Sequence, residues 1–442
     1  MITAADKSLP THPLHYHTVS PYRKLTSTMS SKDSHDDVPK VEPIRDFAQQ
    51  EEIIQALHQI EASLQVMASV PAVPLSHYRV LPDVTKEAYD ILQQGASLIH
   101  GTSTKYTLLG KIDTVEQTKM SQELKQGCEL IATACLVLHE KNSGSSLSLR
   151  KHVVQACRAI IATTLNLIEA FTHGEALTPE HKELGAQKTG AVWQTCSVVL
   201  DRKLPMGNRN AMRRDLLTYT MECQETMDEF QELVDLGPCG DGGEVEQSTH
   251  TTAADDDKAA GDTWESFLSG QNEQYSSKDH DVAQVALTLL KLSRGTIKLS
   301  LQACDAVGDG LKESAKVAAE GEESNEAERK ARLEWIRVLH EECCAVGEGV
   351  TDLGTTLYPP LKISDVSAQL SRQIARVETV LNHVFDASAT VHNDSTGSDQ
   401  QFSLDLHIDI TTMAEKLKSA LSKRKSEVVA ALATVGCTLE NK

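Results

Sequence analysis

The chain has 442 residues, of which 40% are hydrophobic, 24% are charged and only 4% are aromatic. Because this length exceeds what a single hydrophobic core serves well, two domains are expected. The formal net charge of −20 argues against nucleic acid as the main partner, since phosphate binding needs a basic surface. No uninterrupted run of about 18 apolar residues is present, so no membrane-spanning segment is expected.

Residues 1–43 are rich in Ser, Thr, His and Pro and show no periodicity, which predicts a disordered tail. Arginine is too scarce there for a mitochondrial transit peptide, and no signal-peptide pattern is present. Met29 is an alternative translation start. His12, His15 and His17 offer adventitious transition-metal ligands, but a disordered tail without cysteine partners does not predict a built metal site.

Between residues 46 and 236, apolar residues recur at steps of three and four, which places their side chains on one face of an α-helix. The predicted helices span about 46–69, 83–98, 113–140, 147–171, 186–204 and 208–237. Asn208 is expected to be the N-cap of the last helix, and Gly237-Pro238 is expected to end it. Because each apolar face needs a cover, residues 44–236 are predicted to form an N-terminal helical bundle.

The periodic pattern disappears over residues 237–281. This segment holds eleven Asp or Glu residues against Lys258 and Lys278, a local balance of −9. It cannot bury enough apolar surface to offset the entropy of ordering it, so an acidic disordered linker is predicted. Trp264 and Phe267 interrupt it, and they either dock into a groove on a partner or fold back onto their own domain. Folding back is the favoured interpretation.

A second set of periodic segments follows, over about 281–319, 325–358, 366–384 and 406–435. Tyr358-Pro359-Pro360 separates two of them sharply, because a residue before proline is disfavoured in helical geometry. Four long helices joined by short or polar connections predict an up-down bundle over residues 282–440. No segment shows the alternation of a strand, so the predicted fold class is all-α.

Three blocks of sequence, taken in order, resemble one known family. They are Leu149-Arg150-Lys151 with the helix after it, Ala191-Val192-Trp193-Gln194-Thr195-Cys196 with the helix that ends in Met227-Asp228-Glu229-Phe230, and Leu357-Tyr358-Pro359-Pro360-Leu361. Their order, and the acidic segment between the second and third, are similar to those of the cyclin-D-binding proteins (GCIP-like). The resemblance spans about residues 45–435, and the Val-Trp block and the Tyr-Pro-Pro turn are its distinctive parts.

The resemblance implies two talin- or vinculin-like helical bundles joined by the acidic linker. It also implies a negative regulator of cell-cycle progression that binds D-type cyclins, helix-loop-helix transcription factors, or both, without enzyme activity. The free cysteines and the lack of a signal-peptide pattern predict that the protein is in cytoplasm and nucleus. The helix-loop-helix and leucine-zipper labels given to this family find little independent support here, because such apolar faces serve bundle cores equally well. The alternative function is a cytoskeletal adaptor, since this bundle architecture is also that of talin and vinculin segments.

Two short motifs begin like catalytic or nucleotide-binding sequences. Gln155-Ala156-Cys157-Arg158 starts like the caspase signature, but it lies within a predicted helix and Ala159 stands where glycine is required. Gly185-Ala-Gln-Lys-Thr-Gly190 starts like a phosphate-binding loop. Ala191 and Val192 then replace the Lys and Ser/Thr that contact phosphate and Mg²⁺. The sequence therefore predicts no catalytic residues and no cofactor.

The cysteines do not predict a disulfide framework or a metal site. No C-x-x-C pair occurs, and free cysteines in helices behave as small buried hydrophobes in a reducing compartment. The run His340-Glu341-Glu342-Cys343-Cys344 lacks the second histidine of the H-E-x-x-H zinc motif, and Cys344 is expected to be partly exposed and redox-sensitive. Seven cysteines lie within or beside apolar helix faces: Cys128, Cys135, Cys157, Cys196, Cys223, Cys304 and Cys343.

Two clusters of basic residues remain. The first is Arg202, Lys203, Arg209, Arg213 and Arg214, and the second is Lys416, Lys418, Lys423, Arg424 and Lys425. Each is a candidate nuclear-import signal or contact for an acidic partner. A solvated helix face, or pairing with the acidic linker, is the favoured interpretation. Partner-binding residues are not identifiable from the sequence.

Overall fold

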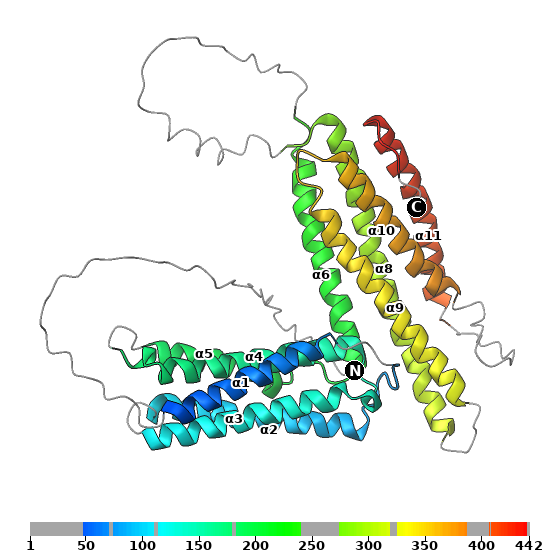
Figure 1. The fold of residues 1–442 in the computed structure, drawn as a ribbon. Coiled ribbons are helices and arrows are strands. Elements are labelled where there is room, and N and C mark those ends of the chain that lie inside the picture. The colour runs from blue at the N-terminus through cyan, green and yellow to red at the C-terminus, as the bar shows by residue number, and fades with distance from the viewer. Residues whose placement is uncertain are drawn as a thin grey trace, which may run out of the picture. The chain divides into compact units, whose positions relative to one another are not determined.

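The computed structural model describes residues 47–69, 74–109, 114–178, 183–239, 274–318, 325–386, 406 and 408–439. These residues form α-helices joined by turns and two short 3-10 helices, without a strand among them (Figure 1). The prediction of an all-α fold with two domains is therefore confirmed. The N-terminal tail, the acidic segment 240–273 and the Trp264 and Phe267 pair lie outside the described residues.

Five helices build the N-terminal bundle: α1 (Phe47–Met67), α2 (Asp83–Leu109), α3 (Thr114–His139), α4 (Leu147–Thr172) and α5 (Leu184–Leu200). Helix α2 packs against α3 and α5, and α4 packs against α1, α3 and α5. Their apolar faces meet in one core, in which Leu57, Leu92, Ile131, Ile160 and Val192 are buried. Within the predicted helix 186–204, however, Trp193 is 40% exposed and stacks on the His100 ring of α2.

Helices α2 and α3 approach each other closely at a pair of glycines. A Cβ added at Gly95 would lie 2.8 Å from the carbonyl oxygen of Gly127. A Cβ added at Gly127 would in turn collide with the Ile99 side chain. The missing side chains let the two backbones pack directly against each other, which brings Ile99 and Ile131 into the core.

Helix α4 is the one described helix that is long and apolar enough, by length and composition, to cross a membrane. The sequence analysis predicts no membrane-spanning segment here, because polar residues interrupt the apolar run of this helix. More than half of the relevant stretch, 56%, is buried inside the protein. Leu149, Val153 and Ile161 from this helix belong to the N-terminal core. Burial among its neighbouring helices accounts for its apolar composition.

The C-terminal bundle contains α8 (Ser277–Ala318), α9 (Asn325–Gly354), α10 (Ile363–Asp386) and α11 (Ile408–Thr434). Each helix packs against the next, and α11 packs back against α8, as Figure 1 shows. The turn after α9 is held by Tyr275, which is fully buried and whose hydroxyl donates to the Leu357 carbonyl at 2.7 Å. The sequence predicts that the linker extends to residue 281, but helix α8 begins at Ser277. Tyr275, just ahead of the helix, already packs against the bundle.

Helix α6 (Asn208–Asp235) joins the C-terminal core. The sequence predicts it as the last helix of the N-terminal bundle. In the structure its apolar residues Met212, Leu216, Cys223 and Phe230 are buried in the same cluster as α8 to α11. It packs along α8 and α9, and among the N-terminal helices it contacts α4. The C-terminal bundle therefore has a fifth helix from the other side of the acidic segment.

The N-cap prediction for this helix is wrong. Gly207, with φ of 96°, is the N-cap, and Asn208 is the first helical residue. The Asn208 side chain is fully buried and accepts from the Ser146 backbone N–H at 2.7 Å. It donates to the carbonyls of His77 and Gly144 at 2.6 and 2.9 Å. Asn208 is used to hold two loops together at the start of α6, because its amide can accept and donate at once.

Candidate functional site

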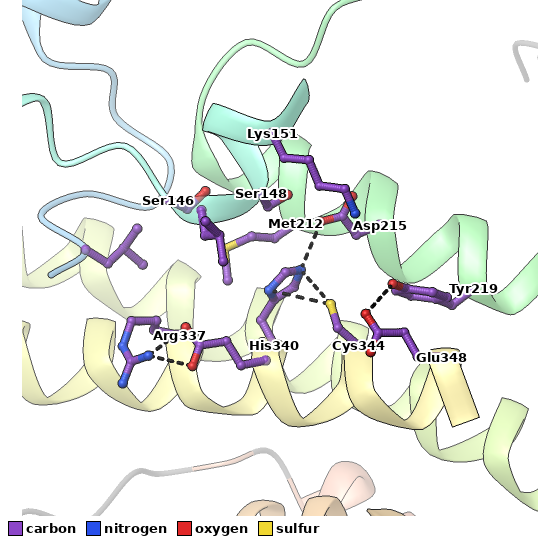
Figure 2. A pocket seen from close by; sticks show the side chains of 13 residues that line it. Ser146, Ser148, Lys151, Met212, Asp215, Tyr219, Arg337, His340, Cys344 and Glu348 are labelled. Carbon is purple, nitrogen blue, oxygen red and sulfur yellow. Dashed lines mark hydrogen bonds and ion pairs between the residues drawn. The ribbon is translucent and has the colours of Figure 1, made fainter. Parts of the chain in front are cut away.

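A cavity of about 230 Å³ lies where the start of α4 meets α6 and α9 (Figure 2). It gathers titratable side chains from helices that are distant in sequence. Its lining residues are Leu75, Ser146, Leu147, Ser148, Lys151, Met212, Asp215, Tyr219, Arg337, His340, Glu341, Cys344 and Glu348. Carboxylate, imidazole and thiol groups therefore share one partly enclosed space.

Asp215 of α6 lies between two histidines. The Nε2 atom of His152, from α4, lies 2.7 Å from Asp215 Oδ1. The Nε2 atom of His340, from α9, lies 3.5 Å from Asp215 Oδ2. Since an ionised carboxylate only accepts hydrogen bonds, both histidines present N–H groups to it. We call Asp215, His152, His340 and Cys344 the Asp215 cluster.

The pKa of the Asp215 carboxyl reflects two opposing effects. Burial alone raises it, because burial disfavours the charged form. The interactions with His152 and His340 outweigh burial and hold the pKa of this carboxyl well below its ordinary value. Asp215 is therefore a half-buried anion that is stabilised by neighbours from two other helices.

Cys344 lies one turn after His340 on the same face of α9. Its Sγ atom is 3.5 Å from His340 Nε2, the same nitrogen that faces Asp215. In a Cys-His-Asp catalytic arrangement the thiol and the acid contact different ring nitrogens. Burial, followed by the negative charge of Asp215, also raises the pKa of the Cys344 thiol. A nucleophilic cysteine needs a lowered pKa, so this geometry does not favour thiol catalysis.

The remaining polar groups around the cavity differ in how well they are paired. The Tyr219 hydroxyl points toward Glu348 (Figure 2) and lies 3.5 Å from its carboxylate. Arg337 pairs with Glu341 at 2.6 Å. Ser148 is only 4% exposed, and its Oγ has no hydrogen bond of ordinary geometry, although it lies near enough to Asp215 to help lower that carboxyl's pKa. A buried hydroxyl without a well-formed bond is uncommon.

A second polar contact joins the loop before α2 to α6 and α8. Arg209 Nε donates to the carboxylate of Asp305, on α8, at 2.9 Å, and Arg213 also forms an ion pair with Asp305. Arg79, from the loop, lies 4.0 Å from Asp305 and 2.6 Å from Asp309. Arg209 and Arg213, from the first basic cluster, thus pair with α8, whereas the sequence offered the acidic linker, an acidic partner or solvent.

The second basic cluster is largely paired within the C-terminal bundle. Lys423 and Arg424 pair with Glu427, and Lys425 lies 3.8 Å from Glu378. Lys418 lies 4.9 Å from the centre of the Phe385 ring, a cation–π distance. Such partly exposed pairs contribute little to stability. This part of the surface therefore resembles an ordinary solvated helix face.

The short motifs that resemble catalytic sequences lie in ordinary helices. Cys157 is fully buried in α4, as predicted for a core residue. The seven cysteines assigned to apolar faces are all buried and free, which confirms that prediction, and Cys344 is partly exposed as expected. The segment 185–190 forms the first turns of α5, and Gly185 packs against the Phe171 ring. It therefore offers no loop to a phosphate.

The sequence did not predict that Asp215, His340 and Cys344 would meet. Their donor atoms all lie within 4.8 Å of one another. The sole signal in the sequence is the four-residue spacing of His340 and Cys344, which places both on one helix face. Asp215 could not be added to them, because its position depends on how α6 packs against α9.

Comparison with family profiles identifies the chain. Residues 91–236 match the profile described as Grap2 and cyclin-D-interacting, N-terminal, and residues 255–382 match its C-terminal counterpart. The two matches follow in order and together cover more than half of the chain. The chain belongs to the Grap2 and cyclin-D-interacting family. No curated protein sequence gives a significant match.

In this Grap2 and cyclin-D-interacting protein, the two family regions do not coincide with the two helical bundles. The N-terminal region ends at residue 236 and includes α6, whereas α6 is buried in the C-terminal core. The Asp215 cluster is built from both regions, with His152 and Asp215 from the N-terminal one and His340 and Cys344 from the C-terminal one. The cavity is therefore a place where the two family regions meet.

Proposed function

We propose that this protein is a non-enzymatic regulator that binds D-type cyclins, helix-loop-helix transcription factors, or both, and thereby restrains cell-cycle progression in cytoplasm and nucleus. The observation that carries the proposal is the ordered match of both halves of the chain to the Grap2 and cyclin-D-interacting family. Binding requires no chemistry, since holding a partner lowers its free concentration by mass action.

The chemistry of the cavity supports binding over catalysis. Cys344 lies beside the His340 imidazole and the Asp215 carboxylate, and burial raises the pKa of its thiol. Cys157, the other candidate nucleophile, is fully buried within α4. A thiol nucleophile needs exposure and a stabilised thiolate, and neither residue combines the two.

A binding face is available on α6. Leu217 and Met221 are 45% and 54% exposed and lie one turn apart, while Leu216 and Cys223 of the same helix are buried. Apolar side chains at this spacing are the anchors by which amphipathic helices recognise each other. We place the partner contact on this face, which belongs to the N-terminal family region.

The test is a pull-down of a D-type cyclin with the purified full-length protein. We expect the double variant Leu217→Asp/Met221→Asp to bind at least about 30-fold more weakly, the loss typical of an interface hot spot. The matched control is Met413→Asp/Val429→Asp on α11, where both residues are similarly exposed. The control should bind like the wild type, and circular dichroism should show equal helix content in all three proteins.

Failure of the wild-type protein to associate with any D-type cyclin or helix-loop-helix factor would contradict the proposed function. Equal weakening by the α6 and α11 variants would remove the assignment to the α6 face. Actin co-sedimentation separates the alternative, a cytoskeletal adaptor, because such an adaptor would pellet with filaments. We expect the protein to stay in the supernatant.

A further inference from the structure

Three metal-binding side chains face one another in the Asp215 cluster. His340 Nε2 lies 3.5 Å from both Asp215 Oδ2 and Cys344 Sγ, and the three donor atoms all lie within 4.8 Å of one another. Figure 2 shows the three side chains converging from α6 and α9. We propose that Asp215, His340 and Cys344 bind a Zn²⁺ ion.

Two of the three donor-atom spacings suit a tetrahedral ion, and the third, between Asp215 and Cys344, is at most 4.8 Å. Ligands at about 2.0–2.3 Å from a tetrahedral zinc lie roughly 3.3–3.7 Å from each other. The two distances from His340 Nε2 fall in this range before any side chain moves. A thiolate, an imidazole and a carboxylate are zinc ligands, whereas Ca²⁺ and Mg²⁺ take oxygen ligands. The donor set therefore favours zinc and similar transition-metal ions over Ca²⁺ and Mg²⁺.

Groups around the three ligands complete the site. His152 contacts Asp215 Oδ1 and leaves Oδ2 for the ion, which is the orienting contact that ligating carboxylates usually receive. The buried Ser148 hydroxyl lines the same cavity without a well-formed hydrogen bond. It can hold a water molecule in the fourth ligand position. Three protein ligands and a water make a four-coordinate zinc site.

The charges around the cavity allow a dication to enter. Lys151 and Arg337 line it, but so do Glu341 and Glu348, and Arg337 is already paired with Glu341. As the zinc–sulfur bond forms, the Cys344 thiol releases its proton to solvent, because a bound metal ion deprotonates a coordinating thiol. His340 binds as the neutral tautomer that carries its proton on Nδ1, so the Nε2 proton that faces Asp215 without metal is given up to solvent while Nδ1 takes one from it. The bound ion would tie α9 to α6, and through His152 to α4 of the N-terminal bundle.

The first measurement uses the full-length protein with His12, His15 and His17 replaced by alanine, which removes the histidine cluster of the tail. After dialysis against Zn²⁺ and desalting, we expect one equivalent of zinc per chain. With Co²⁺ in its place, we expect the thiolate-to-cobalt absorption that only a cysteine ligand gives. Cys344→Ser should abolish this absorption, whereas the control Cys437→Ser, on another partly exposed cysteine, should leave it unchanged.

The second measurement separates ligands from their supports. His152→Ala should weaken zinc binding by about 10–100-fold while the cobalt–thiolate absorption remains, as expected for an orienting contact. His383→Gln is the control, since His383 is also partly buried beside a carboxylate, Glu342, at 3.8 Å. Circular dichroism of each variant without metal verifies that the helices persist.

Two results would overturn the proposal. One is a wild-type protein that retains no stoichiometric zinc after desalting. The other is equal zinc and cobalt binding by the wild type, Cys344→Ser and His340→Gln, which would show adventitious binding elsewhere on the chain. Neither result bears on cyclin binding, which is measured in zinc-free buffer.

Discussion

The two bundles differ in how their cores are completed. The N-terminal core is filled by α1 to α5, with Leu204 and Ala211 at its edge. The C-terminal core takes in α6 and also Leu75 and Tyr78, from the loop before α2. The N-terminal bundle is thus nearly self-contained, whereas the C-terminal bundle depends on residues from across the acidic segment. The two family regions of the sequence therefore differ from the two sets of helices that pack together.

The polar contacts differ in the same way. Within the N-terminal core, the neutral side chains of Gln50, Ser121 and Tyr106 bond one another, with Ser121 Oγ donating to Gln50 Oε1 at 2.8 Å. Where the bundles meet, the neutral bonds of Asn208 are joined by contacts to two carboxylates, those of Asp215 and Asp305. Neutral buried bonds are insensitive to pH, but contacts to a half-buried carboxylate depend on its protonation and on both partners. Acid should therefore affect this contact more than the N-terminal core.

The largest expected effect comes from removing α6. We expect a fragment of residues 206–442 to fold cooperatively and a fragment of residues 274–442 not to do so. Met212, Leu216, Met227 and Phe230 are buried in the core, and at roughly 1.5–3 kcal/mol each their loss removes about 6–12 kcal/mol. This approaches the whole stability of a typical domain, about 5–15 kcal/mol. Urea unfolding followed by circular dichroism measures it.

The control fragment is 44–205, which should fold without α6. Cooperative unfolding of fragment 274–442 with native-like stability would show that α6 is dispensable, and the comparison between the bundles would then fail.

A single substitution tests the same dependence within the intact protein. Phe230→Ala should lower the free energy of unfolding of the C-terminal bundle by about 3–5 kcal/mol, because Phe230 is 2% exposed in that core. Leu217→Ala on the same helix is the control, since Leu217 is exposed, and it should change stability by no more than about 0.5 kcal/mol. Similar losses for both variants would contradict the assignment of the buried face.

Acid should weaken the contact between the bundles through His77. Burial, followed by the positive charge of Arg329, lowers the pKa of His77 to about 4 from 6.5. The folded protein therefore holds the neutral ring. The contribution of neutral His77 to the free energy of unfolding is complete above pH 6.5. It is lost as the pH falls toward 4, which lowers the free energy of unfolding by up to about 3 kcal/mol. Urea unfolding at several pH values measures the slope.

His77→Gln removes this titration, so its stability should change less than that of the wild type between pH 6.5 and 4. The Asp215 carboxyl, whose pKa is lowered, loses its contribution only at lower pH. It therefore does not obscure the test. Identical slopes for the wild type and His77→Gln would show that another group carries the acid sensitivity.

The smallest effect tests the close contact of α2 and α3. Gly127→Ala should destabilise the N-terminal bundle by about 1–3 kcal/mol, the usual cost of overpacking, because the new Cβ would collide with Ile99. Gly101→Ala on α2 meets no atom within 4 Å and should stabilise the helix by about 0.5–1 kcal/mol. Thermal unfolding measures both. Stabilisation by Gly127→Ala would mean that the helices lie further apart than described.

Most of the secondary structure could be predicted, because it depends on local patterns. The three- and four-residue spacing gave the helices and their buried faces, such as Leu216 and Cys223 on α6. The errors concern residues whose partners are distant. Asn208 has the side chain of an N-cap, but its amide bonds Ser146, 62 residues away, and His77, 131 residues away. Trp193 fits an apolar face but stacks on His100 at the surface.

The all-α fold class, the apolar faces of the helices and the family resemblance could all be predicted from the amino-acid sequence. Periodicity and composition are properties of short segments, so they need no knowledge of the fold. The packing of the folded chain was needed to learn that α6 completes the C-terminal core and that Asp215 lies beside His340 and Cys344. An apolar face specifies that it must be covered but not by which helix, and donor atoms from different helices meet only after that choice is made.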